Sequence, residues 1–90
     1  MKWMPFPALN NKRDFFTMDE VNGILVAIGG VRGGGQSLEY INLVDDIGWT
    51  TKQLEFSINS HCSVPISEKE IMIIGGILDN RVSLKKKLKL

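Results

Sequence analysis

The residue types that could do chemistry fall at three places along the sequence, and the first is a glycine-rich stretch. It reads Gly29-Gly-Val-Arg-Gly-Gly-Gly-Gln-Ser37, and glycine-rich loops can point backbone N–H groups at a phosphate group. A phosphate-binding loop, however, requires Gly-Lys-Ser or Gly-Lys-Thr followed by a helix, whereas Gly35-Gln36-Ser37 is followed by a strand pattern. We therefore interpret the stretch as a flexible hairpin loop, with a partner-binding loop centred on Arg32 as the alternative.

The second place is the pair His61-Cys62, which could form a Cys/His nucleophile or a metal site. Neighbouring residues of a strand point to opposite faces, so these two side chains cannot readily meet. The sequence contains one His and one Cys, so no further residue of either type completes a zinc set. We expect Cys62 to be a small buried core residue and His61 to satisfy backbone hydrogen bonds at a strand start.

The third place is Asp45-Asp46, a pair of acids that could bind calcium or act as a general acid. Adjacent acids before Ile47-Gly48 most often cap a turn, and a turn is our interpretation. The sequence therefore predicts no catalytic, cofactor-binding or metal site, and we expect the protein not to be an enzyme.

The charge distribution excludes a nucleic-acid partner. Four of the eleven basic residues lie at positions 85, 86, 87 and 89, so the first 84 residues carry seven positive and ten negative charges. We interpret residues 85–90 as a solvated basic tail, with a nuclear localisation signal or an anionic-surface contact as alternatives. No apolar run approaches the length of about 20 residues needed to cross a bilayer, so no membrane partner is expected. A single cysteine, with no Asn-X-Ser/Thr acceptor, favours a cytoplasmic setting.

An internal repeat organises the elements that must position these residues. An offset of 46 residues relates Trp3 to Trp49, and it also relates Ile28-Gly29-Gly30 to Ile74-Gly75-Gly76. At the same offset, Phe15-Phe-Thr-Met stands beside His61-Cys-Ser-Val, and Ser37-Leu38 beside Ser83-Leu84. Repetition at such a period is typical of propellers and other repeat architectures.

Each landmark of the repeat reads as a strand or a turn. The apolar runs 25–28 and 71–74 end at Gly-Gly. This pattern predicts strands buried on both faces, each ending at a backbone conformation that only glycine adopts at little energetic cost. Further strands are predicted over 38–43, 49–56 and 61–66, with turns at 45–48 and 67–70. Since no stretch has a convincing helical period, we expect an all-β chain.

The chain resembles the Kelch repeat family, in which a strand ending in Gly-Gly precedes a spaced tyrosine and tryptophan. The residues that carry the resemblance are, in order, Arg13, Phe15-Phe16, Asn22-Gly23, Ile24 to Ile28, Gly29-Gly30, Glu39-Tyr40 and Trp49, with a second copy from His61-Cys62 to Gly75-Gly76. The second copy departs from the pattern, because Lys85 and Lys86 stand where the Glu-Tyr pair is expected, and the sequence ends before the position of the tryptophan.

The resemblance implies a partial β-propeller of antiparallel four-stranded blades, one complete and two partial. Residues 1–14 would be the outer strand of a preceding blade and a linker, 15–56 the complete blade and 57–84 a partial second blade. Tyr40 and Trp49 would pack between blades. Two blades cannot close a ring, so we expect a truncated piece of a larger propeller, with self-assembly through exposed blade faces as the alternative.

The implied function is non-enzymatic protein–protein interaction through loops at one end of the blades. Carried onto this sequence, these loops are Val31 to Ser37, Ile77 to Val82 and Ser57 to Ser60, and the predicted contact residues are Arg32, Gln36, Asn80 and Arg81. The alternatives are a fragment of a propeller enzyme, resembling galactose oxidase or a sugar isomerase, and a truncated product without independent function.

Overall fold

The computed structural model describes residues 5–32, 35–79, 81–82 and 85–89, and only the backbone of residues 78, 81, 82 and 85. Within these ranges the chain forms strands and turns and no helix, so the all-β prediction is confirmed. The strands are β1 (Thr17–Val21), β2 (Ile24–Ile28), β3 (Ser37–Asn42), β4 (Thr50–Gln53), β5 (Ile58–Asn59), β6 (Cys62–Pro65), β7 (Glu70–Ile74), β8 (Ile77–Leu78), β9 (Arg81–Val82) and β10 (Lys85–Lys89).

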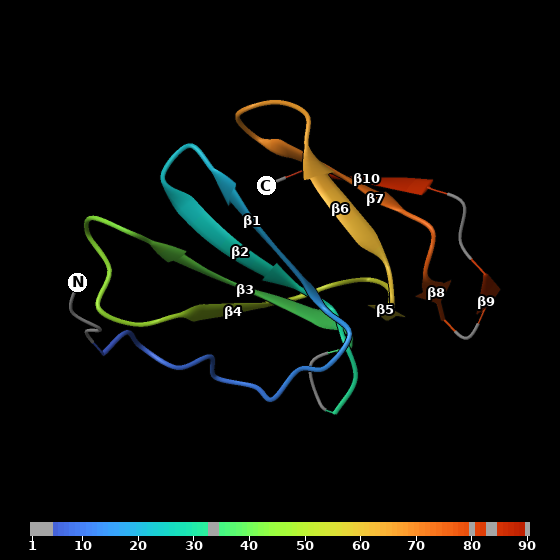
Figure 1. The fold of residues 1–90 in the computed structure, drawn as a ribbon, viewed down its shortest axis with the longest axis horizontal. Coiled ribbons are helices and arrows are strands. Elements are labelled where there is room, and N and C mark those ends of the chain that lie inside the picture. Colours follow the sequence, from blue (N-terminus) through green and yellow to red (C-terminus); the bar gives the residue numbers. More distant parts are fainter. Residues whose placement is uncertain (1–4, 33–34, 80, 83–84, 90) are drawn as a thin grey trace.

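The first sheet is a four-stranded antiparallel meander in the order β1-β2-β3-β4 (Figure 1). Asn22 and Gly23 join β1 to β2 with φ values of 52° and 83°, the paired left-handed conformations of a tight hairpin turn. All four of these strands lie within residues 15–56, the segment that the sequence assigns to one complete unit.

The second sheet is three-stranded, in the order β10-β7-β6, and a small sheet of two-residue strands, β5-β8-β9, adjoins it. In the first sheet Ile28 pairs with Thr17, and in the second Ile74 pairs with Cys62. Equivalent residues of β2 and β7 are therefore 46 positions apart in the sequence, whereas equivalent residues of β1 and β6 are 45 positions apart. The two offsets differ because the β6–β7 turn is one residue longer than the β1–β2 turn. This shift places Cys62, and not Ser63, at the position equivalent to Thr17.

The glycine pairs that end β2 and β7 have matching conformations and matching neighbours. Gly30 and Gly76 have φ values of 104° and 80°. A Cβ atom added to Gly30 would lie 2.7 Å from the Asp14 carbonyl oxygen and 3.0 Å from Phe16 Cβ. One added to Gly76 would lie 2.8 Å from the Asn59 carbonyl oxygen and 2.7 Å from His61 Cβ. In both units the second glycine thus packs against the chain that enters the first strand.

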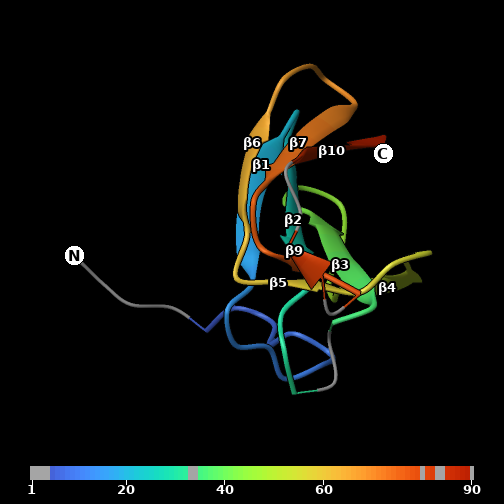
Figure 2. The same cartoon turned by 90° about the vertical axis from the view of Figure 1, so that its right-hand side faces the viewer.

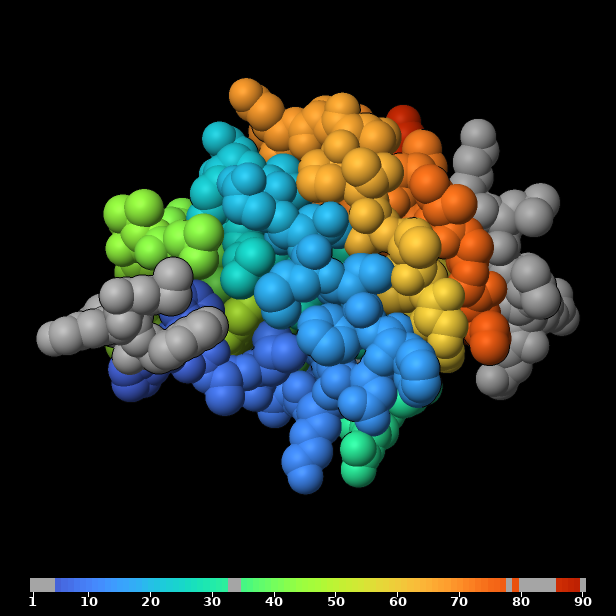
Figure 3. All heavy atoms as spheres, in the orientation of Figure 1, coloured from blue at the N-terminus to red at the C-terminus, as the bar shows by residue number. Residues whose placement is uncertain are grey.

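The hydrophobic core lies where the two sheets meet. β2 and β3 contribute Val26, Ile28 and Leu38, and β7 contributes Ile71 and Ile73. The linker from β4 to β6 closes the core with three further buried residues, Leu54, Phe56 and Ile58. β1 and β6 lie side by side at this seam (Figures 1 and 2), and the space-filling view shows their atoms meeting there (Figure 3).

The lysine-rich segment differs from the solvated tail expected from its composition. Lys85–Lys89 forms β10, which pairs with β7 along its whole length. Leu88 lies opposite Ile71 and packs against the core. Its neighbours Lys87 and Lys89 point to the opposite face of the sheet, as expected for a strand with one buried face. The second unit therefore has three long strands and extends beyond residue 84.

The predicted outer strand of a preceding blade is not present in residues 5–14, which form no strand beyond a single bridge from Asp14 to Val31. These residues run along the first sheet instead (Figure 1). Trp3, which carried that prediction, lies outside the described residues.

Candidate functional site

The three loops predicted to bind a partner adjoin one another through the linker that contains Ser57 to Ser60. The Ile58 N–H donates to the Gly35 carbonyl at 2.9 Å, and the Gly30 N–H donates to the Ile58 carbonyl at 2.8 Å. Toward the other loop, the Ser57 N–H donates to Asp79 Oδ1 at 2.9 Å, and the Asp79 N–H donates back to the Ser57 carbonyl at 2.8 Å. Backbone hydrogen bonds therefore tie the linker to both hairpin loops.

Two of the four predicted contact residues have described side chains, and both are exposed. Arg32 has a left-handed backbone, φ 72°, and its guanidinium lies 3.2 Å from an Asp14 carboxylate oxygen. Gln36 is exposed, while its backbone carbonyl accepts from the Leu54 N–H at 2.9 Å. The backbone of Arg81 begins β9, and Asn80 lies outside the described residues.

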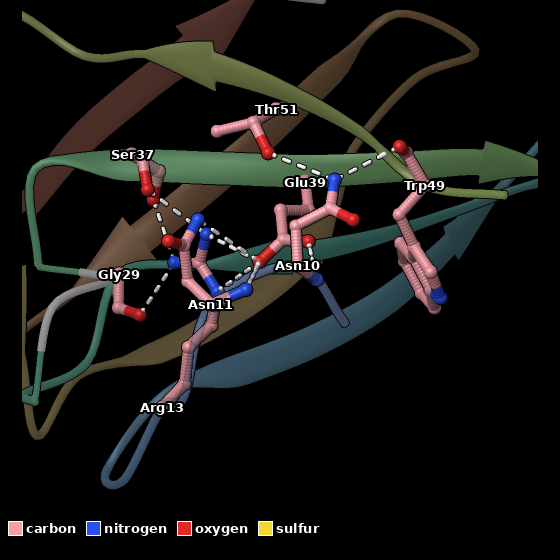
Figure 4. Close-up of polar contacts among 8 residues, drawn as sticks. All are labelled: Asn10, Asn11, Arg13, Gly29, Ser37, Glu39, Trp49 and Thr51. Atoms are coloured by element: carbon pink, nitrogen blue, oxygen red, sulfur yellow. Dashed lines mark hydrogen bonds and ion pairs between the residues drawn. The ribbon is translucent and has the colours of Figure 1, made fainter. Parts of the chain in front are cut away.

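We call the edge of the two units at which the three predicted loops lie the loop end. A buried ion pair that sequence analysis did not predict supports the loop end from inside. Arg13 and Glu39 are 3.0 Å apart, and neither side chain is exposed to solvent. The Arg13 guanidinium also donates to the Gly29 carbonyl at 2.8 Å and to the Ser37 carbonyl at 2.9 Å (Figure 4). Arg13 thereby holds both ends of the β2–β3 loop, the one that carries Arg32.

Glu39 also receives hydrogen bonds from the segment before β1. The backbone N–H groups of Asn10 and Asn11 both donate to its carboxylate (Figure 4). The sequence signal for this cluster is Glu39 itself, an acid between Leu38 and Tyr40 in the middle of β3, because an acid buried in a sheet requires a partner. The sequence did not identify that partner as Arg13, 26 residues earlier.

His61 lies at the seam between the two units. Its Nε2 is 2.7 Å from Thr17 Oγ1 of β1, and its Nδ1 is buried with no direct hydrogen-bond partner among the described residues. Next to it, Ser63 Oγ hydrogen-bonds the Asp19 carboxylate, a second contact between β6 and β1. The side chain of His61 thus bonds across the seam to Thr17 of β1, a side-chain contact that the sequence did not predict.

Burial lowers the pKa of His61 below its usual value of 6.5, although the Asp19 charge and the Ile28 carbonyl act in the opposite direction. The folded chain therefore favours the neutral imidazole, and the unfolded chain takes up a proton first as the pH falls. It follows that the stability contributed by neutral His61 is present above pH 6.5 and is lost as the pH drops toward the folded pKa.

We expect His61→Gln to flatten the pH dependence of unfolding. Urea titrations at about pH 7.5 and about pH 5.5 should show the native chain losing stability on acidification and the variant losing less. An equal loss in both proteins would mean that His61 is not the group responsible.

Of the three residues that were expected to lie in the core or between blades, Tyr40 packs against the core and Cys62 and Trp49 do not lie where they were expected. Cys62 is exposed, which contradicts the expected core position, because the register of β6 turns its side chain to the outer face of the second sheet. Tyr40 packs against the core between the sheets. Trp49 instead meets the N-terminal segment, donating from Nε1 to the Pro7 carbonyl at 2.8 Å and packing edge-on against Phe6.

Asp46 lies in a turn, as the sequence predicted. Its carboxylate accepts from the Asn42 N–H at 2.9 Å, and its own N–H donates to the Asn42 carbonyl at 3.1 Å. Asp46 therefore closes the start of the β3–β4 connection with its carboxylate, whereas Asp45 contributes its backbone N–H, which donates to Asn42 Oδ1 at 3.2 Å.

The outer face of the second sheet is open, whereas the equivalent face of the first sheet is covered. Ile28 is 0% exposed and its counterpart Ile74 is 48% exposed. A Cβ atom added to Gly29 would lie 2.3 Å from the Ile58 carbonyl oxygen, but one added to Gly75 would meet nothing within 4 Å. The second unit thus covers the first, and no described residue covers the second in the same way.

No group of three or more His, Cys, Asp or Glu side chains is arranged to hold a metal ion within the ranges that the structure describes. In the same ranges no helix is long and apolar enough to span a bilayer. Compared with known proteins, the chain matches no protein-family model, and no curated protein is significantly similar to it.

Proposed function

We propose that this chain is part of a Kelch-type β-propeller and acts as a non-enzymatic protein-interaction module through the loop end of its units. The observation that carries the proposal is the linker from Ser57 to Ser60, which is hydrogen-bonded to both hairpin loops. A propeller would bring equivalent loops of every blade to one edge of the ring.

The propeller part of the proposal is supported by the way the two units repeat. Both begin with a left-handed residue, Phe15 or Ser60, each with φ 57°, and both end their second strand at a glycine pair with positive φ. One face of the second unit packs on one face of the first, leaving a like face open for a further unit. Such head-to-tail packing closes into a ring when the rotation per unit allows it.

The binding part is supported by the character of the loop end. Arg32 is exposed, and its side chain forms a surface pair with Asp14, whose side chain is 48% exposed. Surface pairs of this kind are weak, typically about 0 to 1 kcal/mol. Arg32 can therefore exchange Asp14 for an acid of a partner protein at little cost, while the buried Arg13 keeps the loop in place.

Two alternatives have less support. A fragment of a propeller enzyme would need convergent histidines, tyrosines or carboxylates, and the chain has one His and one Tyr, with His61 buried at the seam. A truncated product without independent function predicts that no surface of the chain is selective for a partner. The proposal also admits a second copy of the chain as a partner, through the open face of the second sheet.

We expect Arg32→Glu to remove partner proteins that the native chain retains from a cell extract. Lys69→Glu is the matched control, because it makes the same charge change on an exposed residue of the β6–β7 turn, away from the loop end. Quantitative mass spectrometry of the retained proteins should show one set held by the native chain and by Lys69→Glu but lost with Arg32→Glu. Retention of the same set by all three proteins would refute the loop-end placement.

A further inference from the structure

Among the described residues, the second sheet has no strand equivalent to β4 of the first sheet. β4 pairs with β3 in the first sheet, but the strand equivalent to β3 in the second sheet, β10, has only β7 as a neighbour among the described strands. An unpaired edge of this kind can accept an extended segment of another chain.

The hydrogen bonds between β6 and β7 determine which backbone N–H and C=O groups of β10 point toward β7 and which point away from it. The Ile66 N–H donates to the Glu70 carbonyl, so Glu70, Met72 and Ile74 use their backbone groups toward β6. Ile71 and Ile73 therefore bond to β10, where they lie opposite Leu88 and Lys86.

By the same alternation, residues 85, 87 and 89 direct their N–H and C=O groups away from β7. These are the groups that a fourth strand would pair with.

An apolar cleft lies beside this edge, between β10 and the first sheet. Its volume is about 230 Å³, and its apolar lining comes from β2, β3 and β10 and from the residue after β4: Ile24, Val26, Leu38, Tyr40, Leu54 and Leu88. Lys52 and Lys89 complete the lining. A strand added to β10 would place every second side chain toward this cleft.

The charges of β10 select the occupant. Four of its five residues are lysines, so a second β10, or any basic strand, would meet like charges directly opposite, which is destabilising. Lys87 and Lys89 lie on the face of the sheet that points away from the core, opposite to that of Leu88. Lys87 already forms a partly exposed ion pair with Glu70, at 3.5 Å. Acidic side chains across from Lys87 and Lys89 would add further favourable pairs.

We propose that β10 is a docking edge for an extended segment of a partner protein in which acidic residues alternate with apolar ones. The segment pairs antiparallel with β10, as β4 pairs with β3. Its apolar side chains enter the cleft beside Leu88, and its acidic side chains lie beside Lys87 and Lys89. This inference does not rest on the loop end, because it concerns another part of the surface.

The test uses the full chain and a blocked, fluorescently labelled heptapeptide, Thr-Glu-Val-Glu-Val-Glu-Thr. In antiparallel register its three glutamates lie opposite residues 85, 87 and 89. Fluorescence anisotropy should show saturable binding of this peptide. A peptide of the same composition with broken alternation, Thr-Glu-Glu-Val-Val-Glu-Thr, should bind more weakly, and the lysine version, Thr-Lys-Val-Lys-Val-Lys-Thr, should not bind.

Two substitutions of Lys87 separate backbone pairing from charge. Lys87→Pro removes an N–H that points away from β7, so the β7–β10 ladder keeps its bonds, and we expect affinity to fall by about tenfold or more. Lys87→Gln keeps the N–H but removes the charge, and with it the ion pair to Glu70, and it should weaken binding by about two- to fivefold. Arg32→Glu should leave peptide binding unchanged.

Amide hydrogen exchange of the native chain gives a readout that needs no variant. Bound peptide should slow exchange at Lys87 and Lys89 and leave Lys86 and Leu88, which already bond to β7, unchanged. The proposal is overturned by absence of saturable binding, by equal affinities of Lys87→Pro and Lys87→Gln, or by protection that does not alternate along β10.

Discussion

Gly29→Ala should destabilise the chain by about 4 kcal/mol, whereas Gly75→Ala, at the equivalent position of the second unit, should cost about 1 to 2 kcal/mol. The two glycines have nearly the same backbone, with φ values of 67° and 70°. The free-energy cost of placing alanine in the left-handed region is therefore the same for both substitutions. What differs is the space around the new Cβ atom.

That difference comes from the neighbouring unit. At Gly29 the Cβ atom would lie 2.3 Å from the Ile58 carbonyl oxygen and 2.9 Å from Ile58 Cγ2, while at Gly75 there is nothing within 4 Å. The linker backbone cannot move away cheaply, because the Ile58 carbonyl accepts from Gly30 and the Ile58 N–H donates to Gly35. Overpacking adds about 1 to 3 kcal/mol to the backbone penalty.

Equilibrium urea unfolding of the two variants and the native chain measures the effect. A 90-residue domain has only about 5 to 10 kcal/mol to lose, so Gly29→Ala should leave little or no cooperative transition at room temperature. Similar midpoints for the two alanine variants would show that the linker does not pack on Gly29.

The second large effect is expected from Arg13→Met, at about 3 to 5 kcal/mol, because the change leaves the fully buried Glu39 carboxylate without its cationic partner. Arg32→Met is the matched control. It breaks an ion pair of similar length, 3.2 Å, whose arginine side chain is 66% exposed, and it should cost at most about 1 kcal/mol.

A double variant, Arg13→Met with Glu39→Leu, should recover much of the loss, since replacing both partners of a buried pair by apolar groups is often close to neutral. The recovery will be incomplete because Arg13 also holds the Gly29 and Ser37 carbonyls. If the double variant were as unstable as Arg13→Met alone, the isolated Glu39 charge would not be the cause.

The sequence predicted the elements whose local signals are strong. Apolar β-branched runs ending at Gly-Gly gave β2 and β7, and the glycine-rich stretch gave the β2–β3 loop. Asp45-Asp46 gave the turn after β3. In each case the backbone requirement of a few consecutive residues decides the structure, so no distant partner has to be known.

Register was harder to predict, and it decides which face a side chain joins. Aligning the two units at a constant offset of 46 residues ignores the extra residue of the β6–β7 turn. With that residue counted, Cys62 takes the place of Thr17 on the face that a following unit would cover. In the described chain this face is open, which explains why Cys62 is exposed.

Long-range partners were not predictable from one sequence. The lysine run becomes a strand because β7 offers it a ladder, and its intrinsic preference is weak. Likewise Arg13 carries no local sign of its pairing with Glu39. Of the candidate site, the loops were predicted from the family resemblance, and the buried Arg13 that holds one of them was not predicted.

Residues 13–30 and 58–76 are two copies of one structural unit, in which the closing glycine packs against the entry to the first strand. Nuclear Overhauser contacts in a ¹⁵N- and ¹³C-labelled sample test this directly. We expect cross-peaks from the Gly30 Hα atoms to Phe16 Hβ and, equivalently, from the Gly76 Hα atoms to His61 Hβ. Detection of the first pair without the second, in a folded sample, would contradict the account.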